Sequence, residues 1–342
     1  MNIQTKKQNS AKEIFSSKTC RLFQHVLDKD CIMGRFVFRR FLSLIPTMFL
    51  IITFSFFLIR LAPGGPFSSE KKVTEEVMQN LLKKYHMDEP LYKQYFRYMG
   101  DICRGDLGPS FKNKDFTVNE LIFQSLPNSI LLGVISLLSA LILGVLVGTV
   151  SALKQNSWID YASMSIATVG ISVPTFVVGP VIMLIFAMKL GWLPTSGWIT
   201  GRNADVRTLI MPAITLSLPY FAYIARLSRA SVLEVLRSDY IRTAKAKGLK
   251  QSQIMYKHVL KGAMLPVVSY LGPAFAGIIT GSVVVEQIFL VPGLGKFFVQ
   301  SSLNRDYTLI MGTVIVYSFI LVVMNFVVDV VYGLLDPRIS YK

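Results

Sequence analysis

The sequence predicts an all-α integral membrane protein with six transmembrane helices. The chain of 342 residues is 52% hydrophobic and only 16% charged, which leaves too few polar residues to coat a soluble globule. Six windows are apolar on every side, whereas buried helices of a large soluble protein would keep a polar face. Each window has roughly the 20 residues that a helix needs to cross a bilayer. The windows are Phe41–Leu61, Ser129–Leu153, Tyr161–Met188, Leu209–Leu227, Leu265–Val285 and Leu309–Leu335.

The distribution of basic residues predicts the orientation of the chain. The formal net charge is +16. If residues 1–40 face the cytoplasm, the inner segments carry 21 Lys and Arg and the outer ones 14, in line with the positive-inside rule. We therefore expect both termini in the cytoplasm. Topology accounts for the basic charge, so no nucleic-acid partner is expected. Cys20 and Cys31 would lie inside and Cys103 outside, so no structural disulfide is expected.

Residues 1–32 are polar and basic and lack the apolar core of a signal peptide. We expect them to form a disordered cytoplasmic arm with no essential function, while targeting, docking and regulation remain open alternatives. Residues 33–342 would form the transmembrane domain. Within it, residues from about 62 to 127 would form an outer cap, with helices around 74–85 and 90–103 and a break at Gly105–Pro109.

Small residues and prolines mark the spans. Gly144 with Gly148, and Gly277 with Gly281, are spaced so that helices can approach closely in lipid. Prolines within or beside the spans remove helix hydrogen bonds that neighbouring groups must replace. Such kinks suit a bundle that changes shape. The prolines are Pro174, Pro180, Pro212, Pro219, Pro266 and Pro273.

The loop at about 228–264 is strongly basic, with apolar residues at near-helical spacing. Residues 240–247 favour a helix, and Gly248 follows as a residue suited to the left-handed position after a helix end. We expect a cytoplasmic helix–turn–helix whose first helix ends near Lys247. From charge alone, the loop could equally lie on anionic headgroups.

The run Tyr240-Ile-Arg-Thr-Ala-Lys-Ala-Lys-Gly248, followed by Leu265-Pro266, resembles the EAA loop of bacterial ABC importer permeases in the variant typical of peptide permeases. Arg242 stands where many importers have Glu, so the resemblance implies docking without a Glu-specific contact. The resemblance covers residues 33–342 and is greatest to oligopeptide permease B subunits. Other matching motifs are Arg60–Phe67, Gly105–Phe111, Gly191–Pro194, Val291–Gly295, Asn304–Tyr307 and Asp336–Ile339.

This resemblance implies a type I ABC importer permease fold, with a cytoplasmic coupling helix, in the bacterial cytoplasmic (inner) membrane. It implies import of oligopeptides together with a homologous second permease, two ABC ATPase subunits and an extracytoplasmic peptide-binding protein, all within membrane lipid. The residues implied in ATPase docking are Asp239, Tyr240, Arg242, Ala244 and Gly248.

The chain lacks a phosphate-binding loop, since Gly295-Lys296 is followed by Phe297 rather than Ser or Thr. We therefore expect ATP and Mg on the partner ATPases, and neither cofactor nor enzymatic activity on this chain. No metal site is expected either, because the three histidines form no metal-binding motif.

Polar residues near or within the spans are candidates for function, because they are costly in lipid. Glu286 and Gln287 lie near the predicted outer boundary, where water can reach them, and are candidates for the translocation path. Asp329 lies near the inner boundary, where Arg338 could pair with it.

Alternative functions remain open on the sequence alone. Dipeptide and nickel ABC permeases share the motifs. A secondary transporter would need paired repeats and ionisable groups at mid-bilayer. A membrane-embedded enzyme would need a convergent set of catalytic groups, which the sequence does not present.

Overall fold

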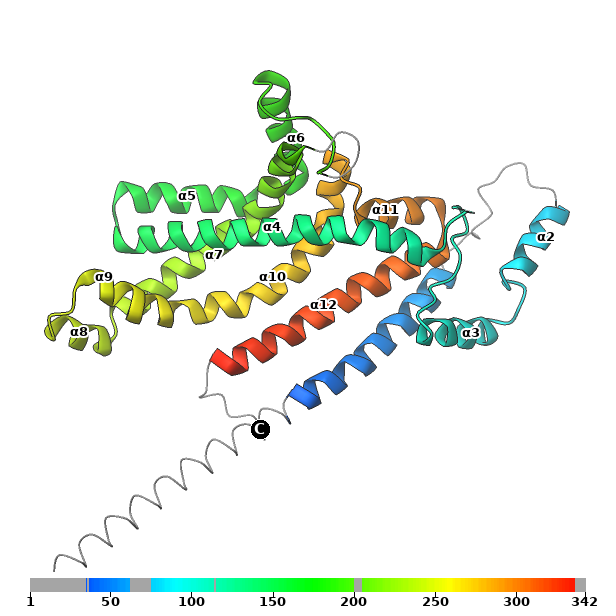
Figure 1. The fold of residues 1–342 in the computed structure, drawn as a ribbon, viewed down its shortest axis with the longest axis horizontal. Helices are drawn as coiled ribbons and strands as arrows, with labels where there is room; N and C mark the ends of the chain where they lie inside the picture. Colours follow the sequence, from blue (N-terminus) through cyan, green and yellow to red (C-terminus); the bar gives the residue numbers. More distant parts are fainter. Residues whose placement is uncertain (1–34, 36, 62–74, 114, 200–204, 336–342) are drawn as a thin grey trace, which may run out of the picture.

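The computed structural model describes all residues except 1–34, 36, 62–74, 114, 200–204 and 336–342. The predicted arm, part of the predicted cap, and Arg338 therefore lie outside the described residues. In Figure 1 the long helices form a bundle, with α2 and α3 toward one end and α8 and α9 at the other. The start of the first helix and the end of α12 both point toward the α8 end, as expected for termini on one side of a membrane.

The described chain is almost entirely helical. The first helix, Val37–Leu61, is drawn in blue in Figure 1. Two π-helical stretches, Met183–Lys189 and Met255–Val259, and a 3₁₀ turn, Val206–Leu209, extend the α-helices. The labelled helices are α2 Glu75–Lys84, α3 Leu91–Cys103, α4 Val118–Leu153, α5 Trp158–Ser172, α6 Thr175–Ile182, α7 Ile210–Leu236, α8 Asp239–Ala246, α9 Gln251–Ile254, α10 Leu260–Phe289, α11 Leu294–Asn304 and α12 Tyr307–Leu335.

Five of the six predicted spans are single helical segments long and apolar enough to cross a membrane. The predicted span Tyr161–Met188 is not one straight helix, and the break lies at one of the predicted proline kinks. There, α5 and the segment Thr175–Lys189 meet at an angle of 109°. Pro174 explains the break, because a residue that precedes proline is pushed out of the helical region, and Val173 has φ −89° and ψ 121°. Counted as one broken span, this pair completes the predicted six.

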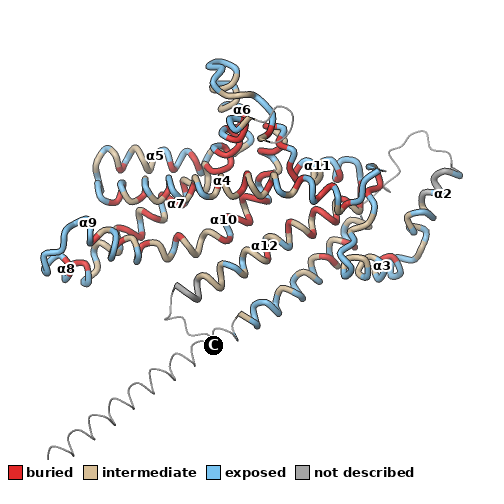
Figure 2. Tube along the Cα trace, viewed as in Figure 1, coloured by how far each residue is buried: buried red, intermediate tan, exposed pale blue. Residues whose placement is uncertain are grey.

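The centre of the bundle is formed by α4, α7 and α10, where Figure 2 shows most of the buried residues. The predicted close approach at Gly144 and Gly148 is confirmed. A Cβ atom at Gly144 would lie 2.8 Å from Ile224 Cγ2, and one at Gly148 would collide with the Ala225 carbonyl oxygen. Because Gly144 and Gly148 have no side chain, the backbone of α4 lies directly against α7 at these two positions.

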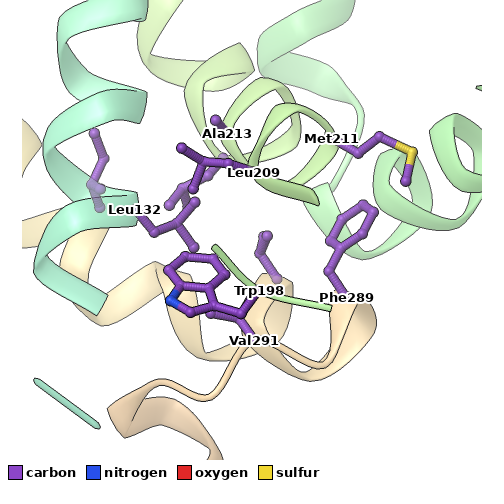
Figure 3. Close-up of a cluster of buried hydrophobic side chains, with 10 residues drawn as sticks. Leu132, Trp198, Leu209, Met211, Ala213, Phe289 and Val291 are labelled. Carbon is purple, nitrogen blue, oxygen red and sulfur yellow. The ribbon is translucent and has the colours of Figure 1, made fainter. Parts of the chain in front are cut away.

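A second packing centre lies near the outer ends of α4, α7 and α10 (Figure 3). Trp198, 5% exposed, packs in the cluster that contains Leu132 of α4 and Val291 after α10. Its indole nitrogen donates a 2.8 Å hydrogen bond to Asn128 Oδ1. This cluster joins the segment that follows the broken span to the central helices.

Candidate functional site

The candidate site is the short helix α8 and the ends of α7 and α10 that support it. Helix α8 lies at one end of the bundle (Figure 1). Its Ile241 is fully buried and its Ala244 is 7% exposed. Both pack in one cluster with Val232 of α7 and with Val259 and Ala263 at the start of α10. The apolar face of α8 therefore rests on both neighbouring helices.

Backbone hydrogen bonds define both ends of α8. At its start, the Ser238 carbonyl accepts from the amides of Ile241 and Arg242 at 3.2 and 3.3 Å. At its end, the Gly248 amide donates to Lys245 O at 3.0 Å and the Leu249 amide to Ala244 O at 3.4 Å. With Gly248 at φ +74°, this is the Schellman arrangement. The predicted helix ending before Gly248 is confirmed.

The solvent-exposed face of α8 and the turn after it carry four of the five residues predicted to dock the ATPase. Asp239, Tyr240, Arg242 and Gly248 are all exposed. Asp239 and Arg242 pair at 3.5 Å with both side chains mostly in solvent, so this ion pair contributes little to stability. It leaves charged groups available to a partner.

Ala244 and Tyr240 contact the helices that support α8. The side chain of Ala244 packs in the interior cluster, so its part in docking stays a prediction. Tyr240 reaches α10, because a Cβ atom at Gly262 would lie 2.9 Å from its hydroxyl oxygen. Gly262 thus provides the space that Tyr240 occupies.

An ion pair that the sequence did not reveal braces the same end of the bundle. Arg229 of α7 donates two 2.7 Å hydrogen bonds to the carboxylate of Asp160 in α5. Asp160 is 2% exposed and also accepts from the Ser151 hydroxyl and the Asn156 amide. The sequence signals only a helix start here, because the acidic Asp160 follows the N-cap Ser157 by three residues. The pair links α7 to the start of α5, and the other two bonds of Asp160 extend this link to α4 and to the loop between α4 and α5.

A second buried carboxylate, Asp306, lies at the opposite end and joins two of the family-like motifs. Asp306 is 1% exposed. It accepts hydrogen bonds from the Ser110 hydroxyl and from the amides of Phe111 and Lys112. It also accepts from the Leu309 amide at the start of α12. The motifs at 105–111 and 304–307 therefore form one structural unit.

A third buried carboxylate, Glu286, joins the motif Val291–Gly295 to α4 and α10. It is 1% exposed and accepts from the hydroxyls of Ser129 and Ser282 and from the Gly295 amide, at 2.7 to 2.8 Å. The expectation that water reaches Glu286 was wrong in this conformation, because the serines of α4 and α10 enclose it. A Cβ atom at Gly293 would collide with Glu286 Oε2, which explains why glycine is needed there.

The remaining polar candidates lie apart from α8. Gln287 is partly buried, and its Nε2 atom has no hydrogen-bond partner among the described residues. The role of Glu286 and Gln287 in a translocation path stays a prediction. Asp329 of α12 pairs with Arg40 of the first helix at 3.2 Å, and the predicted partner Arg338 lies outside the described residues. This pair holds the first and last spans together.

The described residues form a bundle of helices long and apolar enough to cross a membrane, with a short helix packed against one end, and comparisons with known proteins give the family. Residues 140–341 match the family described as "Binding-protein-dependent transport system inner membrane component", and residues 33–133 match a family described as the N-terminal part of such a membrane component. The chain belongs to this family of bacterial inner-membrane permeases.

Curated relatives match over nearly the whole chain. The oligopeptide transport system permease protein OppB of Haemophilus influenzae is 51% identical over 90% of this chain and 100% of its own length. OppB of Escherichia coli is 48% identical over the same shares. The dipeptide transport system permease protein DppB of Bacillus subtilis is 43% identical, over 90% of this chain and 98% of its own length.

Among solved structures, the inward-facing MetNI methionine ABC transporter matches with a TM-score of 0.53 at 19% identity. The match covers 63% of this chain and 96% of the MetNI chain. At this identity the likeness concerns the fold alone, and it supports the importer permease fold expected from the sequence.

Proposed function

We propose that this chain is a permease subunit of an ATP-driven importer that carries oligopeptides across the bacterial cytoplasmic membrane. The observation that carries the proposal is α8, a capped helix whose apolar face is fixed to α7 and α10 while its polar face is exposed. A rigid element between two spans can pass a displacement to both of them. Closure of an ATPase against α8 would therefore tilt α7 and α10 together.

The exposed residues Asp239, Tyr240, Arg242 and Gly248 would form the contact with the ATPase, and Ala244 would hold α8 in place. ATP and Mg would bind the two ATPase subunits. A homologous second permease would complete the translocation path, to which Glu286 and Gln287 remain candidate contributors. An extracytoplasmic peptide-binding protein would deliver the substrate.

The substrate assignment rests on the relatives. Identity to the OppB proteins is 48 to 51%, against 43% for the dipeptide permease DppB and 37% for the oligopeptide permease AppB of Bacillus subtilis. The oligopeptide assignment therefore follows the likeness to the OppB proteins. Competition of labelled peptide uptake by tri- to pentapeptides, dipeptides and nickel would test the assignment. Competition by dipeptides alone would make this a dipeptide permease, and competition by nickel a metal permease.

The docking proposal is tested by co-purification. The complex is expressed with its own ATPases as wild type, as Arg242→Glu on the exposed face of α8, and as Lys83→Glu at the other end of the molecule. Lys83 is exposed at the end of α2, so it is a matched charge-reversal control. We expect the ATPases to co-purify with wild type and Lys83→Glu but to be reduced with Arg242→Glu. If well-folded wild type retains no ATPase and still transports, the secondary-transporter alternative gains support.

A further inference from the structure

A small polar pocket lies on the outer cap, away from α8. Its volume is about 250 Å³, and it is bordered by the end of the first helix, the turn after α2, helix α3, the loop before α4 and the start of α12. Figure 1 shows α3 beside the outer end of the first helix. The charged side chains at its wall are Arg60, Lys84, Arg97 and Asp101, and the imidazole of His86 lies there too.

Arg60 is the central cation of this pocket. Its guanidinium lies 4.8 Å from the centroid of the Phe56 ring and is partly buried. Among the described residues no carboxylate lies within ion-pair distance of Arg60 or Lys84. Arg97, by contrast, pairs with Glu89 at 2.8 Å. A partly desolvated guanidinium without an anion is unusual, because arginine provides donors that suit a carboxylate.

Two buried polar groups at the same pocket also lack partners within the described residues. Gln94 is 8% exposed, and its amide nitrogen donates to the carbonyls of Met87 and Glu89. These two bonds fix the orientation of the amide, yet its Oε1 atom has no donor. The Tyr98 hydroxyl is buried without a partner as well.

The protonation state of Tyr98 makes it a donor. Burial raises the pKa of Tyr98, against a smaller lowering by Arg60, so its hydroxyl keeps its proton at neutral pH. Buried polar groups in proteins are normally paired. The Tyr98 hydroxyl and Gln94 Oε1 are both buried from solvent in this conformation. Arg60 and Lys84 are therefore the groups that an incoming side chain would meet, and Asp101 offsets only part of their positive charge. These cations suit the carboxylate of an acidic residue.

We propose that this pocket receives an acidic side chain of the extracytoplasmic peptide-binding protein when that protein docks on the permease. The inference rests on the proposed function, which requires such a partner. The place of the pocket supports a protein partner, since it lies in the cap beyond the end of the first span. Its size does too, because 250 Å³ holds one side chain and is below the usual range for ligand sites.

The test measures the affinity of the purified peptide-binding protein for the full complex in nanodiscs. The variants are Arg60→Gln, Lys84→Gln and the double variant. Lys93→Gln is the control, since Lys93 is exposed on α3 but does not border the pocket. We expect Arg60→Gln to raise the Kd roughly tenfold, Lys84→Gln to raise it less, and the control to leave it unchanged. The double variant should also show a weaker dependence of Kd on salt.

A second measurement separates this proposal from the proposed function. Peptide-stimulated ATP hydrolysis by the variants should reach the wild-type maximum when the binding protein is saturating. A wild type without such stimulation would count against the proposed function itself. Normal stimulation with a Kd that is unchanged in all variants, or equally raised in Lys93→Gln, would overturn the pocket proposal alone.

The lipid composition of the nanodiscs tests the other anionic occupant. We expect the effect of Arg60→Gln on Kd to be the same with purely zwitterionic lipid and with added phosphatidylglycerol. An effect that appears only with phosphatidylglycerol would assign the pocket to a lipid phosphate and overturn the proposal. Recovery of ATPase subunits with each variant, at wild-type ratio, verifies folding.

Discussion

At the scale of single residues, Gly248 shows how one backbone angle determines a candidate interface. Its φ of +74° lies in the region that L-residues with side chains rarely adopt. A Cβ atom there would meet nothing within 4 Å. Any cost of substitution is therefore conformational, about 1 to 2 kcal/mol for an ordinary residue. Asparagine tolerates this conformation better than β-branched residues do.

We expect Gly248→Val to lower the amount of ATPase that co-purifies with the permease, and Gly248→Asn to lower it much less. The reason is that valine would unwind the turn that presents the exposed face of α8. Quantitative co-purification, with the thermal midpoint of the complex as a stability control, measures both variants. Equal losses with Val and Asn would mean that the side-chain surface at 248 matters, rather than its backbone angle.

The Asp160–Arg229 pair gives a second prediction. Removing one partner of a buried pair leaves the other charge unpaired, which costs up to about 3 to 5 kcal/mol. The cost here should fall below that range because the Arg229 side chain is 26% exposed. We expect Asp160→Asn to lower the thermal midpoint of the purified complex. Combined with Asp160→Asn, Arg229→Gln should lower the midpoint by less than it does as a single substitution. Strict additivity in this double-mutant cycle would show that the two residues do not act as a pair.

These two sites differ in how well the sequence predicts them. Gly248 follows a helix-favouring run, so local chemistry was enough to place the end of α8. Asp160 and Arg229 are 69 residues apart, and only packing of α5 on α7 brings them together. The same limit hid the contact of Asp329 with Arg40, which lies at the far end of the chain.

At the scale of elements, the contact between α4 and α7 depends on Gly144 and Gly148, where α4 has no side chain. We expect Gly148→Ala to reduce the yield of folded protein and its thermal midpoint, because the added methyl group collides with backbone at Ala225. Gly100→Ala is the control. It lies in a helix with nothing within 4 Å of its Cβ position, so alanine should be neutral or stabilising by up to about 1 kcal/mol. Size-exclusion profiles and thermal scans in detergent would measure both, and equal behaviour would refute the close contact.

The helices were the most predictable feature of the chain. Apolar length was sufficient for five spans because lipid requires it of any crossing helix. It failed at Pro174 because hydropathy averages over a window and does not register a change in backbone direction. The proline itself was noted as a kink, but a bend of 109° depends on how α6 packs against α10.

At the scale of the whole molecule, the orientation in the membrane stays a prediction that native cysteines can test. Cys103 is exposed at the end of α3, on the side expected to face outward. We expect a membrane-impermeant maleimide to label Cys103 in intact spheroplasts, and to label Cys20 and Cys31 only after permeabilisation. Cys103→Ser identifies the labelled site. Labelling of Cys103→Ser in intact spheroplasts would reverse the predicted orientation.

The motifs in the sequence predict the architecture of the whole chain, but they do not show which motifs contact each other. Each motif was recognised singly, and nothing in the residue order shows that those at 105–111 and 304–307 meet at Asp306. Glu286 was predicted to meet water because it lies near a span boundary. Its enclosure depends on Ser129, which is 157 residues away.

The hydrogen bonds of Asp306 also determine when, during synthesis of the chain, the loop before α4 can reach its final contacts. Ser110 and Phe111 are bound by a carboxylate that lies 196 and 195 residues further along the chain. At synthesis rates of about 5 to 20 residues per second, the ribosome reaches Asp306 roughly 10 to 40 s after it has made Ser110. During that interval the loop before α4 has already been delivered to the membrane without its acceptor. The contact between the loop before α4 and the start of α12 is therefore completed only after α11 has been made, and a chain truncated before Asp306 would lack it.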